Sequence, residues 1–107
     1  MPGPRTPADA RKWIREAVTM ERYTPTVHFR ERLARRQITM LDTLHVLRRA
    51  PLVEPHPDPP LHDGTCWRVL GRDLDGDRTI GVGVEAFTDE GRRLILCTVI
   101  DVERGGR

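Results

Sequence analysis

Four side chains that can handle phosphate and protons recur at helical spacing in the first half of the chain. At 100° per residue, His28, Arg32 and Arg35 fall within about 60° of one another, and Arg36 lies about 40° further round. Guanidinium groups bind phosphate oxygens bidentately, and an imidazole titrates near neutrality and can move a proton. RNA cleavage requires both phosphate binding and proton transfer. The row therefore predicts an RNA-binding surface. The alternative is an ordinary charged helix face in contact with solvent.

Helices are predicted around this row. The first runs from a Thr6 N-cap to about residue 20, and Pro25 interrupts the helical pattern after it. The second carries the basic row over about Val27–Arg36, with Thr26 as its cap. The row thus lies on one edge of a short helix.

A third helix is predicted between the row and the middle of the chain. Thr39 and Asp42 have the spacing of a capping box, and Arg48 and Arg49 favour the end of the helix at Pro51. Its inward face is predicted to carry three leucines: Leu41, Leu44 and Leu47.

The second half of the chain predicts a sheet. Residues 51–64 contain five prolines and indicate an extended connector, and beyond them CWRVLGRD, TIGVGVEAF and RLILCTVIDV alternate with period two. The expected fold is α+β, with two to three N-terminal helices on one face of an antiparallel sheet of three to four strands. We expect residues 1–107 to form a single domain, with flexible ends at 1–8 and 103–107.

Charge and cysteine content narrow the class of protein. Residues 1–50 hold eleven Lys or Arg against five Asp or Glu, and residues 51–107 hold seven against eleven. A basic half followed by an acidic half indicates a polyanion-binding surface, although an arginine-rich composition also arises in GC-rich genomes. Cys66 and Cys97 lie in strand-like runs and are predicted as core. No run approaches the about 20 apolar residues that span a bilayer, so we expect a cytoplasmic protein.

The stretch YTPTVHFRERLARRQITMLDTLHVLRRAPLVEP resembles a bacterial family of small proteins classed as domain of unknown function 4258. The later strands WRVLG, TIGVGVEAF and LCTVID resemble the family's ending, so the resemblance covers about residues 10–102. Where the family has a glycine before Ile38, this chain has Gln37. The first stretch matches the family pattern at eight positions: His28, Arg32, Leu33, Arg36, Ile38, Thr39, Asp42 and Leu47.

That family is similar to the ribonuclease-toxin superfold of RelE-like and motility quorum-sensing regulator-type mRNA interferases, the barnase–EndoU–colicin–RelE group. The resemblance implies a small, metal-independent endoribonuclease toxin of a toxin–antitoxin system. It also implies RNA as the substrate, an antitoxin protein as the partner, and no cofactor. A homodimer is a further expectation.

The resemblance assigns roles to the basic row. His28 would be the proton-transfer group or a contact to the 2′-hydroxyl. Arg32 and Arg36 would hold the scissile phosphate, with Arg35 as a supporting charge and Arg68 joining from the first long strand.

Three further side chains are candidate RNA contacts. Tyr23 or Trp67 would stack on a base, a contact worth roughly 1–3 kcal/mol. Thr98 matches the threonine that closes the family's last strand. Each has a structural alternative: Trp67 as a core residue, Tyr23 in helix packing, and Thr98 as part of the sheet.

No metal site is predicted. His56, Asp58, His62 and Asp63 lie close together in the connector, but a proline-rich loop does not define a coordination geometry. The stretch DLDGDRTIG resembles the start of a calcium loop, yet Val84 stands where the bidentate glutamate belongs, so we interpret it as a hairpin turn.

Two other functions are compatible with the sequence. The chain could be a non-catalytic RNA- or protein-binding domain of the same fold, because a single histidine is a thin supply of acid–base groups. It could also be an interaction module in which Glu31 and Asp42 neutralise the arginines.

Overall fold

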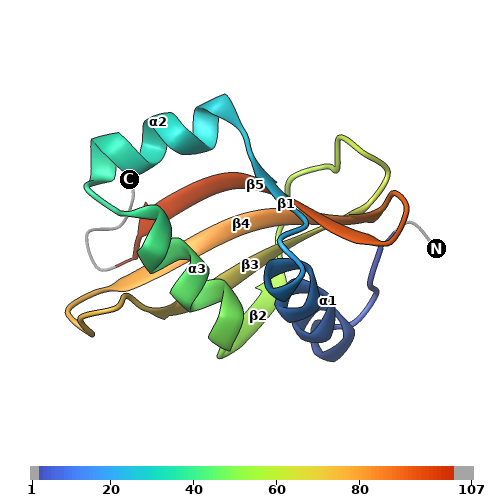
Figure 1. Ribbon diagram of the computed structural model, residues 1–107, viewed down its shortest axis with the longest axis horizontal. Coiled ribbons are helices and arrows are strands. Elements are labelled where there is room, and N and C mark those ends of the chain that lie inside the picture. Colours follow the sequence, from blue (N-terminus) through green and yellow to red (C-terminus); the bar gives the residue numbers. More distant parts are fainter. Residues whose placement is uncertain (1–2, 103–107) are drawn as a thin grey trace.

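The computed structural model describes residues 3–102, which form three helices and one five-stranded sheet (Figure 1). The protein is therefore α+β, as predicted, and the predicted tail at 103–107 lies outside the described residues. The elements in chain order are α1 (Pro7–Thr19), β1 (Tyr23–Pro25), α2 (Val27–Arg36), α3 (Met40–Arg49), β2 (Leu52–Pro55), β3 (Thr65–Arg72), β4 (Thr79–Thr88) and β5 (Arg92–Asp101).

Each helix begins at a threonine. The hydroxyls of Thr6, Thr26 and Thr39 accept a hydrogen bond from the backbone N–H three residues later, at 3.0–3.1 Å. The Asp42 carboxylate in turn accepts a hydrogen bond from the Thr39 backbone N–H, which completes a capping box. These local signals confirm the predicted helix starts, and the predicted second helix has the same bounds as α2.

The sheet is larger than predicted and mixed. Its order is β1-β5-β4-β3-β2, with β1 parallel to β5 and the other pairs antiparallel. The prediction of three to four antiparallel strands is wrong at both edges. Tyr23–Pro25 pairs with β5 instead of only breaking a helix, and Leu52–Pro55 pairs with β3 instead of belonging wholly to the connector. Both strands end in proline, which an edge strand tolerates because its outer N–H groups need no partner.

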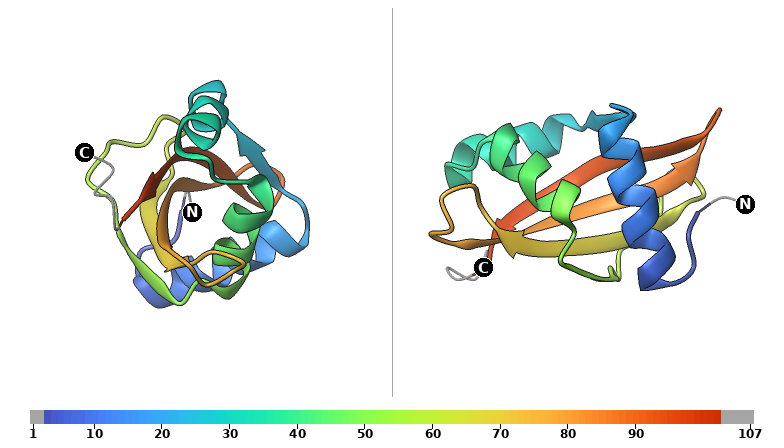
Figure 2. Two further views of the ribbon diagram at one scale, coloured as in Figure 1. Left: turned by 90° about the vertical axis from the view of Figure 1, so that its left-hand side faces the viewer. Right: turned by 60° about the horizontal axis from the view of Figure 1, so that its bottom comes forward.

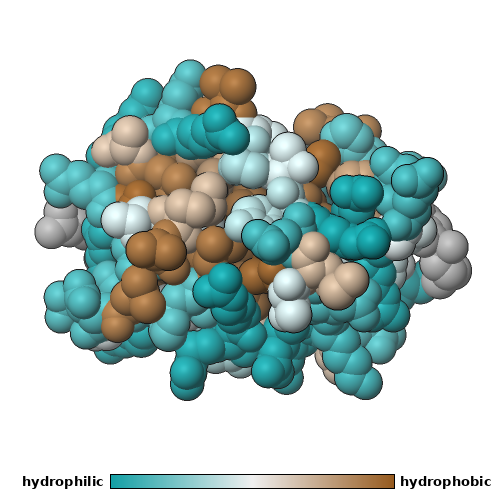
Figure 3. Space-filling model, in the orientation of Figure 1, coloured by the Kyte–Doolittle hydropathy of each residue, from teal (hydrophilic) through white to brown (hydrophobic). Residues whose placement is uncertain are grey.

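Helices α1 and α3 cover one face of the sheet and enclose the core. On β4, Val82, Val84 and Ala86 point into this core and are at most 1% exposed. The inward face of α3 differs from the prediction at one position, because Leu41 is 66% exposed whereas Met40 packs against the core. Figure 3 shows apolar surface between α2 and α3 within a largely hydrophilic face.

Helix α2 does not share this position. It packs against β5, and the left view of Figure 2 shows it at the edge of the curved sheet, apart from α1. Phe29 is fully buried in the core, so one edge of α2 still belongs to it. The prediction that all helices pack on one face is therefore wrong for α2, and this displacement leaves its basic edge beside the open face of the sheet.

The chain before α1 packs on the sheet as well. Gly3 and Pro4, within the segment predicted to be flexible, are buried, and the Thr65 hydroxyl donates to the Pro4 carbonyl at 2.8 Å. None of the helices formed by residues 3–102 is long and apolar enough to cross a membrane.

Candidate functional site

A cavity of about 610 Å³ lies on the face of the sheet that α1 and α3 do not cover. It is bounded by α2, by strands β3, β4 and β5, and by the connector 56–64, which runs along the open side of the sheet in Figure 2 (left). His28, Arg32 and Thr98, three of the predicted site residues, line it together. The cavity therefore joins α2 and β5, two elements far apart in the sequence.

Thr26 fixes the start of α2 against the sheet. Its hydroxyl accepts from the Phe29 N–H at 3.0 Å and donates to the Leu96 carbonyl at 3.1 Å. Its backbone N–H donates to the same carbonyl, also at 3.1 Å. Because α2 is anchored to β5 in its first turn, the side chain of His28 has a defined place beside the cavity.

The floor of the cavity contains a β-bulge. Gly83 pairs with Thr98, but its neighbour Val84 pairs with Leu96, so Cys97 has no partner in the register. A side chain on Gly83 would place its Cβ 2.6 Å from the Thr98 methyl carbon. Glycine is therefore required at this position, beside the irregularity in the β4–β5 pairing.

His56 is the residue that the sequence interpretation missed. The sequence indicates for it only a possible role as a metal ligand, but it lines the same cavity as His28 and Arg32. Its backbone N–H donates to the Cys66 carbonyl at 3.0 Å, which extends the β2–β3 pairing by one residue. The sequence signal for this site is the spacing of His28 and Arg32 on α2. No sequence pattern links that helix to the connector that carries His56.

A buried carboxylate holds the connector in place. Glu85 is 1% exposed and accepts hydrogen bonds from three backbone N–H groups of the connector. The distances are 2.8 Å from Leu61, 2.7 Å from His62 and 3.1 Å from Gly64. A carboxylate is acceptor-only, so one side chain of β4 satisfies three donors of an otherwise irregular loop. The roof of the cavity is thus attached to its floor.

The two cysteines at the cavity are poor nucleophiles. Burial, with a smaller contribution from the Glu85 carboxylate, raises the pKa of the Cys66 thiol to about 11 and also raises the pKa of Cys97. Both thiols are protonated at neutral pH, and the thiolate is the reactive form. They lie on strands on either side of β4, about 9–10 Å apart by strand spacing, too far for a disulfide.

The basic row divides in the structure. Arg32 is half-buried at the cavity and has no hydrogen-bond or ion-pair partner within residues 3–102. Arg35 is exposed outside the cavity. Arg36 also lies outside it, and its Nε is buried without a partner among the described residues. Of the four residues in the basic row, only His28 and Arg32 line the cavity.

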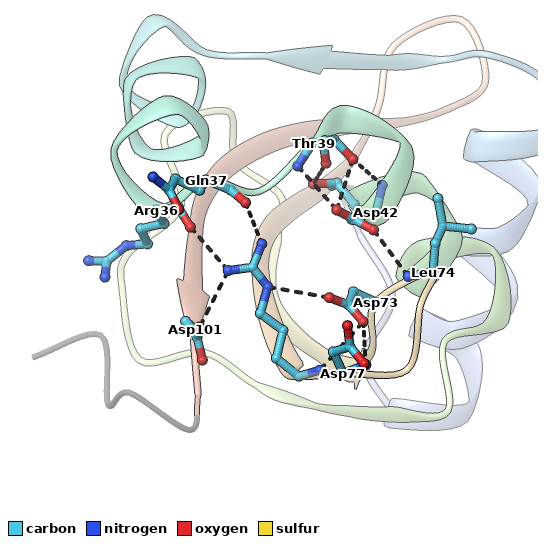
Figure 4. Close-up of polar contacts among 10 residues, drawn as sticks. Arg36, Gln37, Thr39, Asp42, Asp73, Leu74, Asp77 and Asp101 are labelled. Carbon is cyan, nitrogen blue, oxygen red and sulfur yellow. Dashed lines mark hydrogen bonds and ion pairs between the residues drawn. The ribbon is translucent and has the colours of Figure 1, made fainter.

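Arg78, from the hairpin between β3 and β4, fixes the other end of α2. Its guanidinium donates to the carbonyls of Arg36, at 3.2 Å, and Gln37, and pairs with Asp73 and Asp101 at 3.3 and 3.5 Å. Figure 4 shows these acceptors gathered at the α2–α3 turn. Gln37 ends α2 in a left-handed conformation, with φ of 54°. The turn therefore forms without glycine, and Arg78 binds its free carbonyls.

The remaining predicted contacts lie at different depths. Arg68 lies on the open face in the same cross-strand row as Gly83 and Thr98, outside the cavity, with its guanidinium 3.7 Å from the Glu54 carboxylate. Trp67 is 4% exposed in the core and its Nε1 donates to the Thr65 hydroxyl, so it offers no surface to a base.

Tyr23 is partly buried and packs against the core, outside the cavity. Within residues 3–102, no group of three or more His, Cys, Asp or Glu side chains is arranged to hold a metal ion.

Comparisons with known proteins identify no relative: no protein-family model, no curated protein and no solved structure matches the chain.

Proposed function

We propose that this protein is a small endoribonuclease that cleaves RNA at the cavity between α2 and the sheet. The observation that carries the proposal is Arg32, a half-buried guanidinium that lines the cavity without an anionic partner among residues 3–102. Withdrawing a cation from water is costly unless an anion compensates it. A phosphodiester fits this requirement because its two oxygens match the guanidinium fork.

His28 supplies the proton chemistry next to this cation. It lies one helical turn before Arg32 on the same wall of the cavity and is exposed to solvent. In the proposed reaction it accepts the proton of the 2′-hydroxyl, and Arg32 stabilises the charge that develops on the phosphate oxygens. These groups belong to the protein, so the reaction needs no metal.

The interaction-module alternative has less support. In that alternative the Asp42 carboxylate helps to neutralise the row, whereas in the structure it accepts hydrogen bonds from Thr39 and from the Leu74 N–H. Neither Arg32 nor Arg35 forms an ion pair within the described part of the chain. The further proposal that the enzyme is the toxin of a toxin–antitoxin pair rests on the resemblance of residues 10–102 to a toxin-like family.

The test is cleavage of a fluorescent single-stranded RNA by purified protein in the presence of a chelator. We expect wild-type protein to cleave it, and we expect Arg32→Ala to lower kcat/KM roughly 10²–10³-fold, the effect of removing one transition-state hydrogen-bond donor. Arg30→Ala is the matched control, because Arg30 is exposed on the same helix and does not line the cavity.

Expression of the wild-type protein should also arrest growth, and expression of the Arg32→Ala variant should not. RNA binding without cleavage by folded wild-type protein would favour the non-catalytic alternative. Absence of both binding and cleavage would overturn the proposal.

A further inference from the structure

RNA cleavage by 2′-oxygen attack needs two proton transfers, and α2 supplies one histidine for them. The 2′-hydroxyl must lose a proton as its oxygen bonds to phosphorus, and the 5′-oxygen must gain one as its bond to phosphorus breaks. One side chain cannot hold both positions, because the entering and leaving oxygens lie on opposite sides of the phosphorus in an in-line displacement. A second acid–base group would have to enter the cavity from another element.

His56 enters the cavity from the connector. Its side chain is 11% exposed, and its Nδ1 accepts a hydrogen bond from the Asp58 N–H at 3.2 Å. On the other side of the ring, Cδ2 and Nε2 lie 3.7 Å from the point where a Cβ on Gly83 would stand. The missing side chain of Gly83 therefore makes room for an imidazole, whose Nε2 edge faces the sheet beside Thr98.

We propose that His56 is the general acid of this site, and that His28 is the general base. The proposal rests on the ribonuclease function proposed above. Because Nδ1 of His56 accepts the Asp58 amide, the neutral ring carries its proton on Nε2, the atom at the cavity floor. To act as the acid from Nε2, the ring must first be protonated on both nitrogens, with its Nδ1–H directed at the Asp58 carboxylate, whose oxygen lies 3.7 Å from that atom.

The reaction is a transfer of the phosphoryl group within the RNA chain. His28 takes the proton of the 2′-hydroxyl, and the 2′-oxygen forms a bond to phosphorus. The bond from phosphorus to the 5′-oxygen breaks, and that oxygen takes the Nε2 proton of protonated His56, which is left as a neutral ring with its remaining proton on Nδ1. The products are a 2′,3′-cyclic phosphate and a free 5′-hydroxyl, and water later exchanges the protons of the two histidines.

The surroundings of His56 fit a ring that is protonated in each cycle. A protonated ring donates from Nδ1 as well, and the Asp58 carboxylate oxygen lies 3.7 Å from that atom. The titratable and charged groups that line the cavity with it come from every neighbouring element: Asp58 from the connector, Cys66 from β3, Glu85 from β4, Cys97 from β5, and His28 and Arg32 from α2. Asp58 is a positioning residue, since it acts through His56.

A substrate whose leaving group needs no proton separates the acid from the base. A nucleoside 3′-(4-nitrophenyl phosphate) releases a stable phenolate, whereas RNA releases a 5′-alkoxide that must be protonated. We expect His56→Ala to lower kcat/KM on RNA roughly 10²–10⁴-fold and to change it less than about threefold on the nitrophenyl substrate. His28→Ala should lower it on both substrates.

His62→Ala is the matched control. His62 lies in the same connector, and its ring stacks on Phe87 with the ring centroids 5.2 Å apart, outside the cavity. The His62→Ala variant should cleave both substrates at the wild-type rate. The fold of each variant is checked by circular dichroism, and His56→Gln replaces His56→Ala if the smaller side chain prevents folding.

The pH dependence gives a second measurement on folded protein. Wild-type kcat/KM on RNA should rise and then fall with pH, because the base must be unprotonated and the acid protonated. His56→Gln should lose the fall at high pH, and His28→Gln should lose the rise at low pH. A merely structural role for His56 would leave the shape of the profile unchanged.

The outcomes distinguish this inference from the proposed function. Wild-type protein that cleaves neither substrate overturns both. Wild-type cleavage of RNA together with an unaffected His56→Ala variant, or with equal losses on the two substrates, overturns only the role of His56.

Discussion

The two faces of the sheet are built by different physical means. The face under α1 and α3 is filled with apolar side chains, such as Val82 and Val84 of β4, which exclude water by close packing. The opposite face carries Gly83 and Glu85 at the intervening positions of the same strand. There the covering segment is an irregular loop, held by hydrogen bonds to a carboxylate rather than by apolar burial.

This difference shows how a small domain separates stability from function. Hydrophobic packing stabilises the fold without specifying individual polar positions, so α1 and α3 suffice for it. The cavity instead needs particular atoms at particular places, and each is fixed by a hydrogen bond from another element: Thr26 to β5, His56 to β3, and the connector to Glu85. Variants on the two faces should therefore fail in different ways.

The largest expected effect on stability lies on the core face. Leu96→Ala removes a fully buried side chain from β5 and should lower the free energy of unfolding by about 2–5 kcal/mol, measured by urea denaturation. RNA cleavage by the protein that remains folded should be unchanged, because the Leu96 side chain lies in the core, and the Leu96 carbonyl that accepts from Thr26 is kept in the variant. Thr98→Ala, two residues along the same strand, should do the reverse, with a stability loss within about 1 kcal/mol and a clear loss of cleavage. Equal destabilisation by both variants would contradict the division between the faces.

Much of the fold follows from local sequence signals. The threonine caps place all three helix starts, and alternation of apolar residues places β3, β4 and β5 within one residue. The edge strands β1 and β2 could not be predicted in this way, because three or four residues ending in proline show no period and are ordered only by the neighbouring strand. The edge position of α2 depends on the same long-range pairing.

The site could be predicted only in part, for a related reason. His28 and Arg32 share a helix face, so their spacing indicates a common role. His56 joins them through contacts distant in sequence, because Glu85 holds the connector over the sheet and Gly83 leaves space for the ring. Spacing alone also overstated Arg36, which lies one turn beyond the cavity.

An intermediate effect is expected where the open face is anchored. In Glu85→Gln, the amide NH₂ replaces one carboxylate oxygen and faces a backbone N–H that donates to that oxygen in the wild-type protein. At least one buried donor therefore loses its partner. We expect the free energy of unfolding to fall by about 1–3 kcal/mol, and cleavage to fall as well because His56 is released from its position. Both are measured on the same preparation, by denaturation and by RNA turnover.

Glu54→Gln provides the control for this anchor. Its carboxylate is 42% exposed and lies 3.7 Å from the Arg68 guanidinium, so the loss of stability should stay below about 1 kcal/mol. If the two glutamate variants behave alike, the open face does not depend on its buried carboxylate.

The smallest effect is expected at a polar contact on the side of α3, away from the cavity. Partial burial alone would raise the pKa of Asp42, but hydrogen bonds from the Leu74 and Thr39 N–H groups and the Thr39 hydroxyl, with the charge of Arg78, outweigh it and lower the pKa below its usual value. A carboxyl whose pKa is lower in the folded state stabilises the fold at neutral pH, and this contribution disappears as the pH falls through its folded pKa. Asp42→Asn should therefore lower the free energy of unfolding at pH 7 by less than about 1 kcal/mol, seen as a slightly lower Tm. The loss should be smaller still in strong acid. RNA cleavage should not change, because Asp42 ties α3 to the β3–β4 hairpin and not to the cavity. A Tm difference between the two proteins that stays constant from pH 7 to pH 2 would show that the carboxylate charge contributes nothing.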